Sequence, residues 1–599
     1  MATRRQIHML LCTALVADSG SSSSPPLVER LRSLRDSLDG IADKPQRRSL
    51  APALQTLQDS VRQCSKELIE TRDENGLTPL HHAVISHDLE RLDALLDLDL
   101  DREAEAGPLR VRPLHLSVLG GDEHCDVLLK LLKAGALPNA PDAKGTTALQ
   151  AASTLNMPHV CSVLLGHGAK SERRGPNGVR ALEMAGWANS AEAAEVLLRA
   201  GAQVDAGDKK RRTAVHAASA NDAAECLEVL LEHGGDPERC DVRGRRALHY
   251  AVRACRCSDP ECPRTRTVQL LLDANVQCEA EDGGGWSALD VAAEHNRVAP
   301  LRMLLERGVS PNRKGSAGCP PLTLAAHAGA REAVALLLAH GADIDARDGN
   351  GASALQAAAV GAHAPTLKLL LQAGASIGAT DDVGRNAAHY AARSGSASCL
   401  RALRRAGASL TAETSFGWQP LHVAANHSCA NAMHVLLQSG VPPAQGDCVG
   451  WTPLHLACHR LGQDVGGCRC KRCLKLHERR KQCVSLLLQK GASADAVDKR
   501  RATAAHLAAA HDDVEGLRLL RAHGANLWAE DVDGQTPLRI ARHLHRPSRA
   551  VRLLLLLPGD IDFEHDDELD PFDEDDEDMD EDMDEDQLRR DEDDADSEW

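Results

Sequence analysis

Residues 452–457 read Thr-Pro-Leu-His-Leu-Ala, and nearly the same phrase stands at residues 78–83 and 419–424. Weaker copies fill the intervals, and the third position of the phrase recurs mostly every 33 residues. Fourteen such units follow one another from about residue 73 to residue 557. A fixed period of this length indicates a repeat architecture, in which each unit buries its apolar face against its neighbours.

Each unit carries the same local signals in the same order. An opening such as Asp348-x-x-Gly351 is typical of a tight turn in which glycine adopts a positive φ. The Thr-Pro pair that follows suits an N-cap and the first position of a helix. A short Ala-rich helix comes next, and a second helix carries a Leu pair such as Leu436 and Leu437 before a terminating glycine. The pattern predicts one tight turn and two short helices per unit.

Over residues 73–557 this pattern resembles the ankyrin repeat. The resemblance implies an all-α repeat solenoid, in which stacked helix pairs are joined by short β-hairpin tips. It also implies a protein that binds other proteins and has no catalytic role. Arg110, Arg211 and Arg501 replace the turn glycine in three units. A residue with a side chain is strained at that position if the turn persists.

Four segments depart from the repeat. Residues 1–72 do not match it and are expected to form a helical cap region with a Ser/Pro-rich linker, although the apolar run at 9–17 is also compatible with a targeting segment. Residues 558–599 are expected to be an acidic disordered tail. Insertions near 254–266 and 458–482 lengthen two units between their helices, where a loop can grow without disturbing the stack.

Composition fits thin repeated layers in a reducing compartment. Hydrophobic residues make up 43% of the chain but aromatic residues only 2%, so the core must consist of Ala, Leu and Val. The 19 cysteines are mostly scattered singly, which favours an intracellular, cytoplasmic or nuclear protein with reduced thiols. No run approaches the roughly 18 apolar residues that a membrane span needs, so no membrane partner is expected.

Charge is distributed very unevenly. Residues 560–599 hold 25 acidic and 2 basic side chains, whereas the whole chain has a net charge of −18, so the remainder is slightly basic. The tail could bind basic proteins, mimic nucleic acid, fold back onto the basic second insertion, or act only as a solubilising segment. Direct nucleic-acid binding is not expected, because the body is only weakly basic and shows no nucleic-acid-binding motif.

Eight units carry histidine at the fourth position of the phrase. A side chain repeated at one place in so many units is architectural, and the family resemblance implies that it hydrogen-bonds between turns. No nucleophile, phosphate-loop or dinucleotide signature accompanies these residues, so no enzyme activity is predicted. The histidines are His81, His115, His216, His249, His389, His422, His455 and His506.

The second insertion is the better of two candidate metal sites, because the first offers Cys255, Cys257 and Cys262 but no clear fourth ligand. Cys468, Cys470, Cys473 and His477 supply four sulfur or nitrogen ligands within ten residues, the number that a structural zinc site requires. The alternative is a loop with incidental thiols, since Cys-x-Cys is less typical of zinc than Cys-x-x-Cys. No other cofactor is expected.

Two groups of tip residues are candidates for partner binding. Trp286, Trp418 and Trp451 each follow a turn glycine directly, and Phe416 lies at the adjoining tip. Tryptophan is enriched among binding hot spots, but packing within the stack would explain these positions equally well. The second group is the basic run of Lys209, Lys210, Arg211 and Arg212, which suits a nuclear import signal, an anion-binding edge or a solvated tip.

These observations favour a scaffold or adaptor that binds proteins along the groove of the stack and at its tips. One alternative is a nuclear, chromatin-facing protein that holds basic partners with its acidic tail. Another is a substrate receptor of a larger assembly such as a ubiquitin ligase, although no recruitment motif is evident after the last repeat.

Overall fold

A computed structural model describes residues 72–542 of the 599-residue chain. Residue 74 and residues 97–100, 122–124, 257–264, 316–317 and 463–470 are excluded from this description, as are the side chains of residues 460–462 and 471–477. The expected cap region and the expected acidic tail lie outside the described residues. Two compact units make up the chain, Met1–Cys278 and Glu279–Trp599, and each is treated by itself below.

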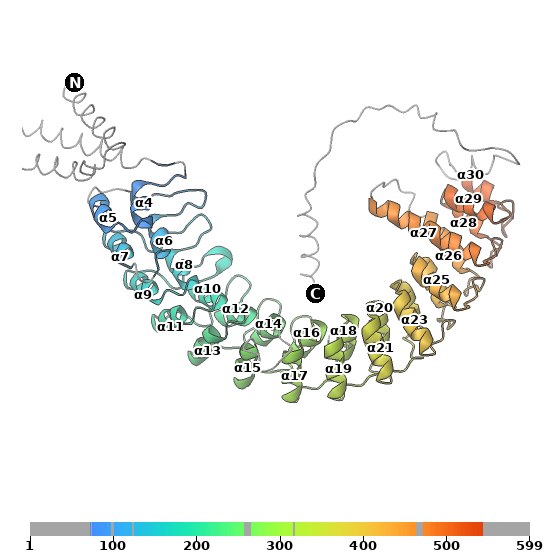
Figure 1. The fold of residues 1–599 in the computed structure, drawn as a ribbon, viewed down its shortest axis with the longest axis horizontal. Coiled ribbons are helices and arrows are strands. Elements are labelled where there is room, and N and C mark those ends of the chain that lie inside the picture. Colours follow the sequence, from blue (N-terminus) through green and yellow to red (C-terminus); the bar gives the residue numbers. More distant parts are fainter. Residues whose placement is uncertain are drawn as a thin grey trace, which may run out of the picture. The chain divides into compact units, whose positions relative to one another are not determined.

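The first unit is a stack of helix pairs (Figure 1). Each first helix packs against the first helices of the neighbouring repeats, and each second helix packs against its own partner. Its helices are α4 (Pro79–Ile85), α5 (Leu89–Leu96), α6 (Pro113–Val118), α7 (Cys125–Lys133), α8 (Ala148–Thr154), α9 (Pro158–Gly166), the 3-10 turn η2 (Pro176–Gly178), α10 (Ala181–Ala188), α11 (Ala191–Arg199), α12 (Ala214–Ala220), α13 (Ala224–Glu232), α14 (Ala247–Ala254) and α15 (Arg266–Asp273).

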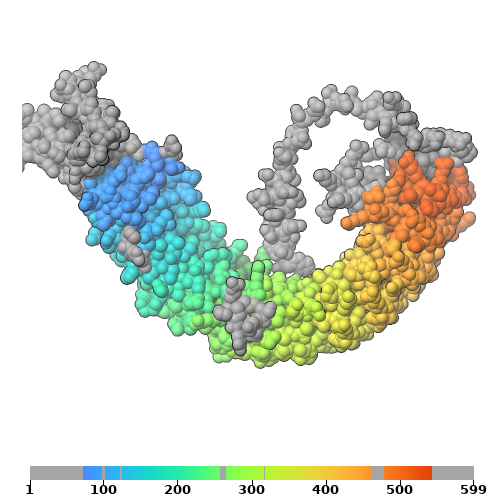
Figure 2. All heavy atoms as spheres, in the orientation of Figure 1, coloured from blue at the N-terminus to red at the C-terminus, as the bar shows by residue number. Residues whose placement is uncertain are grey.

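The second unit repeats the same arrangement. In Figure 2 its successive repeats, green to orange, abut one another in chain order. Its helices are α16 (Ala288–Glu294), α17 (Val298–Glu306), α18 (Pro321–His327), α19 (Arg331–Ala339), α20 (Ala354–Val360), α21 (Ala364–Gln372), α22 (Ala387–Arg393), α23 (Ala397–Arg405), α24 (Pro420–Asn426), α25 (Ala430–Gln438), α26 (Pro453–Gly462), α27 (Lys471–Gln489), α28 (Ala504–Ala510), α29 (Val514–Ala522) and α30 (Pro537–Arg542).

The predicted all-α repeat fold is confirmed, and its core has the expected composition. Ala325, Ala326, Ala358 and Ala359 are fully buried where α18 meets α20. Side chains this small let neighbouring helices approach closely, which is how so few aromatic residues suffice. The hairpin tips are tight turns, and the part of the chain described here contains isolated antiparallel bridges, such as Arg347 with Ser353, in place of extended strands.

Within a compact unit, the repeated histidines link one ankyrin-type repeat to the next. His422 accepts the backbone N–H of Gln419 at Nδ1 (3.1 Å), so its proton sits on Nε2, which donates to the carbonyl of Trp451 in the following unit (3.2 Å). His455 repeats the arrangement with the carbonyl of Ala502 at 3.2 Å. The architectural role expected for these histidines is confirmed by the geometry.

Some repeats without this histidine fill the position with another donor and acceptor. Gln356 accepts the N–H of Ser353 at 2.6 Å and donates to the carbonyl of Arg385 at 2.7 Å, so it copies both bonds of a histidine. A carboxylate cannot donate, and the unit that carries Glu183 recruits Arg180, which donates to the carbonyl of Gly207 (3.0 Å). The link between neighbouring repeats is therefore made by histidine, by glutamine or by a glutamate–arginine pair.

Arginine keeps the glycine turn at the three substituted tips. The φ angles of Arg110, Arg211 and Arg501 are 46°, 61° and 61°, in the region that Gly351 and other turn glycines occupy. The turn itself is unchanged, since the N–H of Arg211 still donates to the carbonyl of Asp208 at 3.0 Å. The strain expected from the sequence is therefore present at these tips.

Replacing one strained residue with glycine should stabilise the first unit. We expect Arg211→Gly to raise the free energy of unfolding by about 0.5–1 kcal/mol, because relief of left-handed strain exceeds the added chain entropy of glycine. Arg243→Gly is the matched control, because Arg243 is an exposed tip arginine that lacks a positive φ. It should lower stability by about 0.5–1 kcal/mol. Denaturant titration of both variants checks the opposite signs, and destabilisation by Arg211→Gly would contradict the account.

The second insertion is partly helical and not the simple loop that its sequence suggested. The second helix of that repeat, α27, has 19 residues, whereas α25 of the preceding repeat has 9. The extra length lies at the N-terminal end of α27, within the insertion, and residues 463–470 before it lie outside the described residues. The insertion thus lengthens an existing helix. None of the helices described here is long and apolar enough to cross a membrane.

Candidate functional site

Backbone hydrogen bonds fasten the tips of the second unit to one another. The N–H of Ser415 donates to the carbonyl of Val383 at 2.9 Å, and the N–H of Cys448 donates to the carbonyl of Phe416 at 3.1 Å. The N–H of Lys499 continues the series to the carbonyl of Val449 at 3.0 Å. Equivalent residues of successive tips therefore stand side by side, one repeat apart.

This alignment turns three separate residues into a stripe. Val383, Phe416 and Val449 occupy the third position of three consecutive tips. Phe416 and Val449 are 59% and 47% exposed. The tips on either side carry Asn350 and Arg500 at this position, so the apolar stretch has defined ends.

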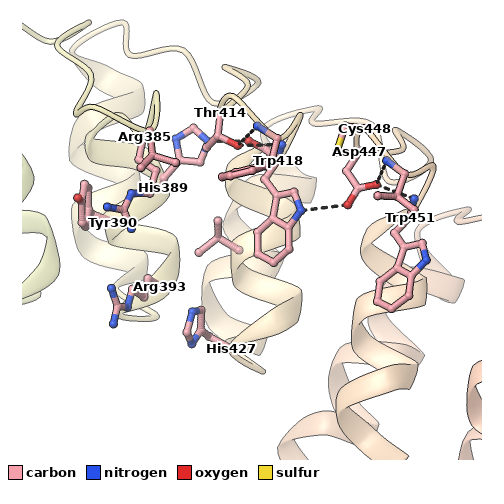
Figure 3. A pocket seen from close by; sticks show the side chains of 14 residues that line it. Arg385, His389, Tyr390, Arg393, Thr414, Trp418, His427, Asp447, Cys448 and Trp451 are labelled. Atoms are coloured by element: carbon pink, nitrogen blue, oxygen red, sulfur yellow. Dashed lines mark hydrogen bonds between the residues drawn. The ribbon is translucent and has the colours of Figure 1, made fainter. Parts of the chain in front are cut away.

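Two tryptophans form the floor beside the stripe. The indole N–H of Trp418 donates to Asp447 of the next tip at 3.0 Å, and that of Trp451 donates to Asp498 at 3.1 Å. Their polar atoms are thus already bonded, and the half-buried rings offer apolar faces (Figure 3). The Trp451 ring also contacts the His459 ring at an interplanar angle of 57°, with ring centroids 5.4 Å apart.

Between the tips and the inner helices lies a hollow of about 540 Å³, called here the tip groove. Figure 3 shows Trp418 and Trp451 hanging from successive tips, with Arg393 and His427 toward the far ends of α22 and α24. An apolar hollow with a few polar groups is the usual form of a binding site. The tip groove is lined by Val383, Arg385, His389, Tyr390, Arg393, Thr414, Phe416, Trp418, Val423, His427, Asp447, Cys448, Val449 and Trp451.

One wall of the tip groove is fixed by a buried carboxylate. Asp381 accepts the hydroxyl of Tyr390 at 2.6 Å and Nε of Arg385 at 2.6 Å, and the Arg385 guanidinium lies 5.0 Å from the centre of the Tyr390 ring. Burial opposes ionisation of Asp381, but the bonds from Tyr390 and Arg385 outweigh it and lower its pKa. Burial also raises the pKa of Tyr390, so the phenol keeps its proton.

The remaining charges at the tip groove are mainly cationic. Arg393 is exposed at the end of α22, and Lys499 and Arg501 are exposed on the tip that follows Val449. The carboxylate of Asp447 is occupied by backbone N–H groups of its own turn and by Trp418. A ligand therefore meets apolar surface with positive charge at its border.

The other candidate partner residues lie elsewhere. Trp286 is half-buried on an earlier tip of the same compact unit and does not line the tip groove. Lys209, Lys210 and Arg211 are exposed on a tip of the first compact unit. Arg212 is engaged within that turn, where it donates twice to Asp208, at 2.9 and 2.8 Å. The structure thus brings together Phe416, Trp418 and Trp451, and leaves the basic run as a separate tip.

The zinc hypothesis remains a prediction. Cys468 and Cys470 lie outside the described residues, and Cys473 and His477 belong to α27 at positions whose side chains are not described. Among the side chains that are described, no group of three or more His, Cys, Asp or Glu residues has the arrangement to hold a metal ion.

Sequence reasoning missed Val383 and Val449 on the stripe and Tyr390 and Arg393 on the wall. A single valine or arginine within a repeat does not stand out in the sequence as a candidate binding residue. A signal was nevertheless present, because the third tip position is apolar in three consecutive repeats, at intervals of 33 residues.

Comparison with known proteins agrees with this architecture. Family models described as ankyrin repeats match residues 114–208, 182–262, 289–338, 322–414, 388–466 and 473–567. Over 85 residues, 14% of this chain, the sequence is 35% identical to inversin of Gallus gallus and 34% identical to inversin of Homo sapiens. That match spans only 8% of either inversin.

A solved structure gives a further similarity. The ankyrin repeat domain of human ASB11 is matched over its whole length to 40% of this chain, with 29% identity and a TM-score of 0.34. The family models extend over most of the chain and reach into both compact units. With its repeated phrase, paired helices and linked tips, the chain belongs to the ankyrin-repeat family.

Proposed function

We propose that this chain is a non-catalytic scaffold or adaptor that holds a partner protein in the tip groove. Ankyrin repeats are protein-interaction modules, which sets the class of function. The observation that carries the proposal is the stripe of half-buried Val383 and exposed Phe416 and Val449, which lies beside two indoles whose polar atoms are already bonded. Apolar surface that does not serve the fold is typical of a surface that a partner covers.

The tip groove has the features of an interface centre. Aromatic side chains that lie in a hollow bordered by charge are the usual hot spots of protein recognition. Tyr390 and Arg385 are held rigidly by Asp381, so little conformational entropy is lost when a ligand packs against them. A partner segment with apolar side chains and acidic flanks fits this surface.

The best single test is truncation of Phe416. We expect Phe416→Ala to weaken binding of a captured partner by at least about 2 kcal/mol, a factor of roughly 30, because an exposed ring would be lost from the interface centre. Stability should change by less than about 0.5 kcal/mol, since Phe416 is 59% exposed. Partners would be captured with the full chain from a cell lysate, and their affinity for each variant measured by titration.

Val532→Ala is the matched control. Val532 is an apolar tip residue with 62% exposure and does not line the tip groove. Its truncation should leave partner binding unchanged. Equal affinity of the Phe416→Ala variant and the unmodified chain for every captured partner would remove the tip groove from consideration.

Trp418 and Trp451 are less suitable for that test than the sequence suggested. If these tryptophans served only binding, their truncation to alanine would leave thermal stability nearly unchanged. Each indole instead donates to Oδ2 of a carboxylate on the following tip, so truncation would leave that oxygen of Asp447 and of Asp498 without its indole donor. A loss of about 1–3 kcal/mol of stability per site is therefore expected as well.

We also propose an intracellular location, without choosing between cytoplasm and nucleus. Cys226, Cys399, Cys458 and Cys483 are buried in the helical layers, where they serve as small apolar side chains. Burial raises the pKa of Cys226 and of Cys483 to about 12, so both stay protonated thiols. Thiols used in this way suit a reducing compartment.

A further inference from the structure

The chain itself contains a segment whose chemistry matches the tip groove. Only three phenylalanines occur in 599 residues. Phe416 stands at the tip groove, whereas Phe563 and Phe572 lie in an acidic segment with Leu569 between them. An apolar and cationic site and an apolar and acidic segment are therefore both present in one chain that is otherwise poor in aromatic residues.

The spacing of the apolar residues in the segment fits the spacing of the tips. Repeats stack about 8–10 Å apart. In a polyproline II chain, which has three residues per turn and rises about 3.1 Å per residue, Leu569 and Phe572 are about 9 Å apart, Phe563 and Leu569 are about 19 Å apart, and all three share one face. These separations correspond to one and two repeats. Pro571 cannot continue a helix and favours an extended residue before it, which suits such a placement.

The charges also correspond. Residues 560–573 carry acidic side chains on both sides of each apolar residue. Arg393, Lys499 and Arg501 border the tip groove as exposed cations. Their neighbour Arg500 pairs with Asp533 at 3.0 Å, whereas these three side chains meet no carboxylate within the described part of the chain.

The chain between Arg542 and the acidic segment is long enough for the segment to reach the tip groove. The last described residue, Arg542, belongs to the fourteenth repeat, and the tip groove centres on the eleventh, about 30 Å away at the usual stacking distance. Residues 543–562 can span up to about 66 Å when extended. The cationic tip of Lys499 and Arg501 is in the thirteenth repeat, between Arg542 and the tip groove.

We propose that residues 560–573 of the same chain occupy the tip groove, so that a partner must displace them. Phe563, Leu569 and Phe572 would pack against the stripe and the indoles, and the carboxylates between them would face Lys499, Arg501 and Arg393. This inference rests on the proposed function, because it treats the tip groove as a peptide-binding site. It adds a regulatory element, since an internal competitor raises the affinity that a partner needs.

Cys448 provides an internal probe for the test. Its thiol is exposed and lines the tip groove, so a bound segment should shield it from alkylation. A tethered segment has an effective concentration of about 1 mM, so binding with a Kd near 0.1 mM would slow alkylation about tenfold. The experiment measures the rate of Cys448 alkylation in the full chain by peptide mass spectrometry, at low salt and micromolar protein.

The double variant Phe563→Ala with Phe572→Ala, made in the full chain, should accelerate that reaction about tenfold. Added salt at 0.5 M should have a similar effect, because it screens the carboxylates from the cations. Met579→Ala with Met583→Ala is the matched control, since it removes two apolar side chains from the tail outside the segment and should change nothing. Cys240 is the reference thiol and should react at the same rate throughout.

Each other outcome overturns the inference. Equal alkylation rates for the full chain and the double phenylalanine variant would show that the segment does not occupy the tip groove. Protection that grows with protein concentration would assign the bound segment to a second copy of the chain. If Cys448 is unshielded but Phe416→Ala still loses its partners, the proposed function stands and only the internal competitor is wrong.

Discussion

Asp381→Ala should lower the free energy of unfolding of the second compact unit by about 3–5 kcal/mol, the largest loss that we expect from one exchange at the tip groove. Asp381 is buried and accepts four hydrogen bonds: from the N–H groups of Val383 (3.0 Å) and Arg385 (2.7 Å), from Nε of Arg385 (2.6 Å) and from the hydroxyl of Tyr390 (2.6 Å). Alanine would leave a buried phenol and a partly buried guanidinium without their acceptor.

Two exchanges serve as controls for Asp381. Asp382→Ala removes the neighbouring carboxylate, which is exposed, and should change stability by less than about 0.5 kcal/mol. Tyr390→Phe removes one donor while keeping the ring and should cost about 1 kcal/mol. Denaturant titration of the three variants checks the order. A loss below about 1 kcal/mol for Asp381→Ala would show that the turn can rearrange to satisfy Tyr390 and Arg385 in another way.

The arrangement of a buried aspartate bonded by an arginine and a tyrosine occurs once more in the chain. Asp241 accepts the hydroxyl of Tyr250 at 2.7 Å and two bonds from Arg245, whose guanidinium lies 4.8 Å from the centre of the Tyr250 ring. The spacing Asp-x3-Arg-x4-Tyr is identical in both places, and the chain has no other tyrosine. Both tyrosines are thus employed to fix a tip to the helix after it, and at Tyr390 this rigid wall also lines the tip groove.

The fold followed from the sequence because its determinants recur. The period of 33 residues, the turn glycines and the fourth-position histidines each appear many times, so an error in one unit is corrected by the others. The tip tryptophans were also found from this register. The repeat even predicted the strain at Arg211, since the φ of the turn is imposed by the neighbouring tips and not by the residue that occupies it.

Features that form between successive repeats could not be predicted from the sequence in the same way. Val383 and Val449 are ordinary residues until backbone bonds between tips place them beside Phe416. The bonds from Trp418 and Trp451 to Asp447 and Asp498 likewise depend on which face of each indole meets the next tip. At the second insertion, the position between two helices suggested a loop, although residues such as Glu and Lys propagate a helix well once the second helix of the same repeat has formed.

Acidification should destabilise the second unit between about pH 6.5 and pH 5, and exchange of its histidines for glutamine should suppress that loss. Burial lowers the pKa values of His389, His422 and His455, and the nearby carbonyls and carboxylates offset this only in part. Their neutral forms are therefore favoured in the folded state. Stability is complete above the ordinary pKa of about 6.5 and is lost as the pH falls below it, because the unfolded chain then takes up protons first.

These histidines resist protonation because their Nδ1 atoms accept hydrogen bonds in the folded state. In His422 this atom accepts the N–H of Gln419, and a proton there would place two donors against each other. Gln356 performs the same two bonds without titrating. The triple exchange of His389, His422 and His455 to glutamine should therefore keep stability at pH 7.5 within about 1–2 kcal/mol, while each exchange removes up to about 1.4 kcal/mol of stability loss per pH unit.

The reciprocal exchange gives the sharpest check. Gln356→His should add up to about 1.4 kcal/mol per pH unit to the acid-induced loss, because it introduces a fourth histidine of the same kind into this run of repeats. Carboxylates such as Asp381, whose pKa is lowered from 3.8, lose their contribution only at lower pH and so do not confuse the comparison. Denaturant titrations at pH 7.5, 6.5 and 5.5 measure the slopes. If the triple variant and the unmodified chain lose stability in parallel, protonation of these histidines does not control the acid response, and the links between repeats tolerate a charged ring.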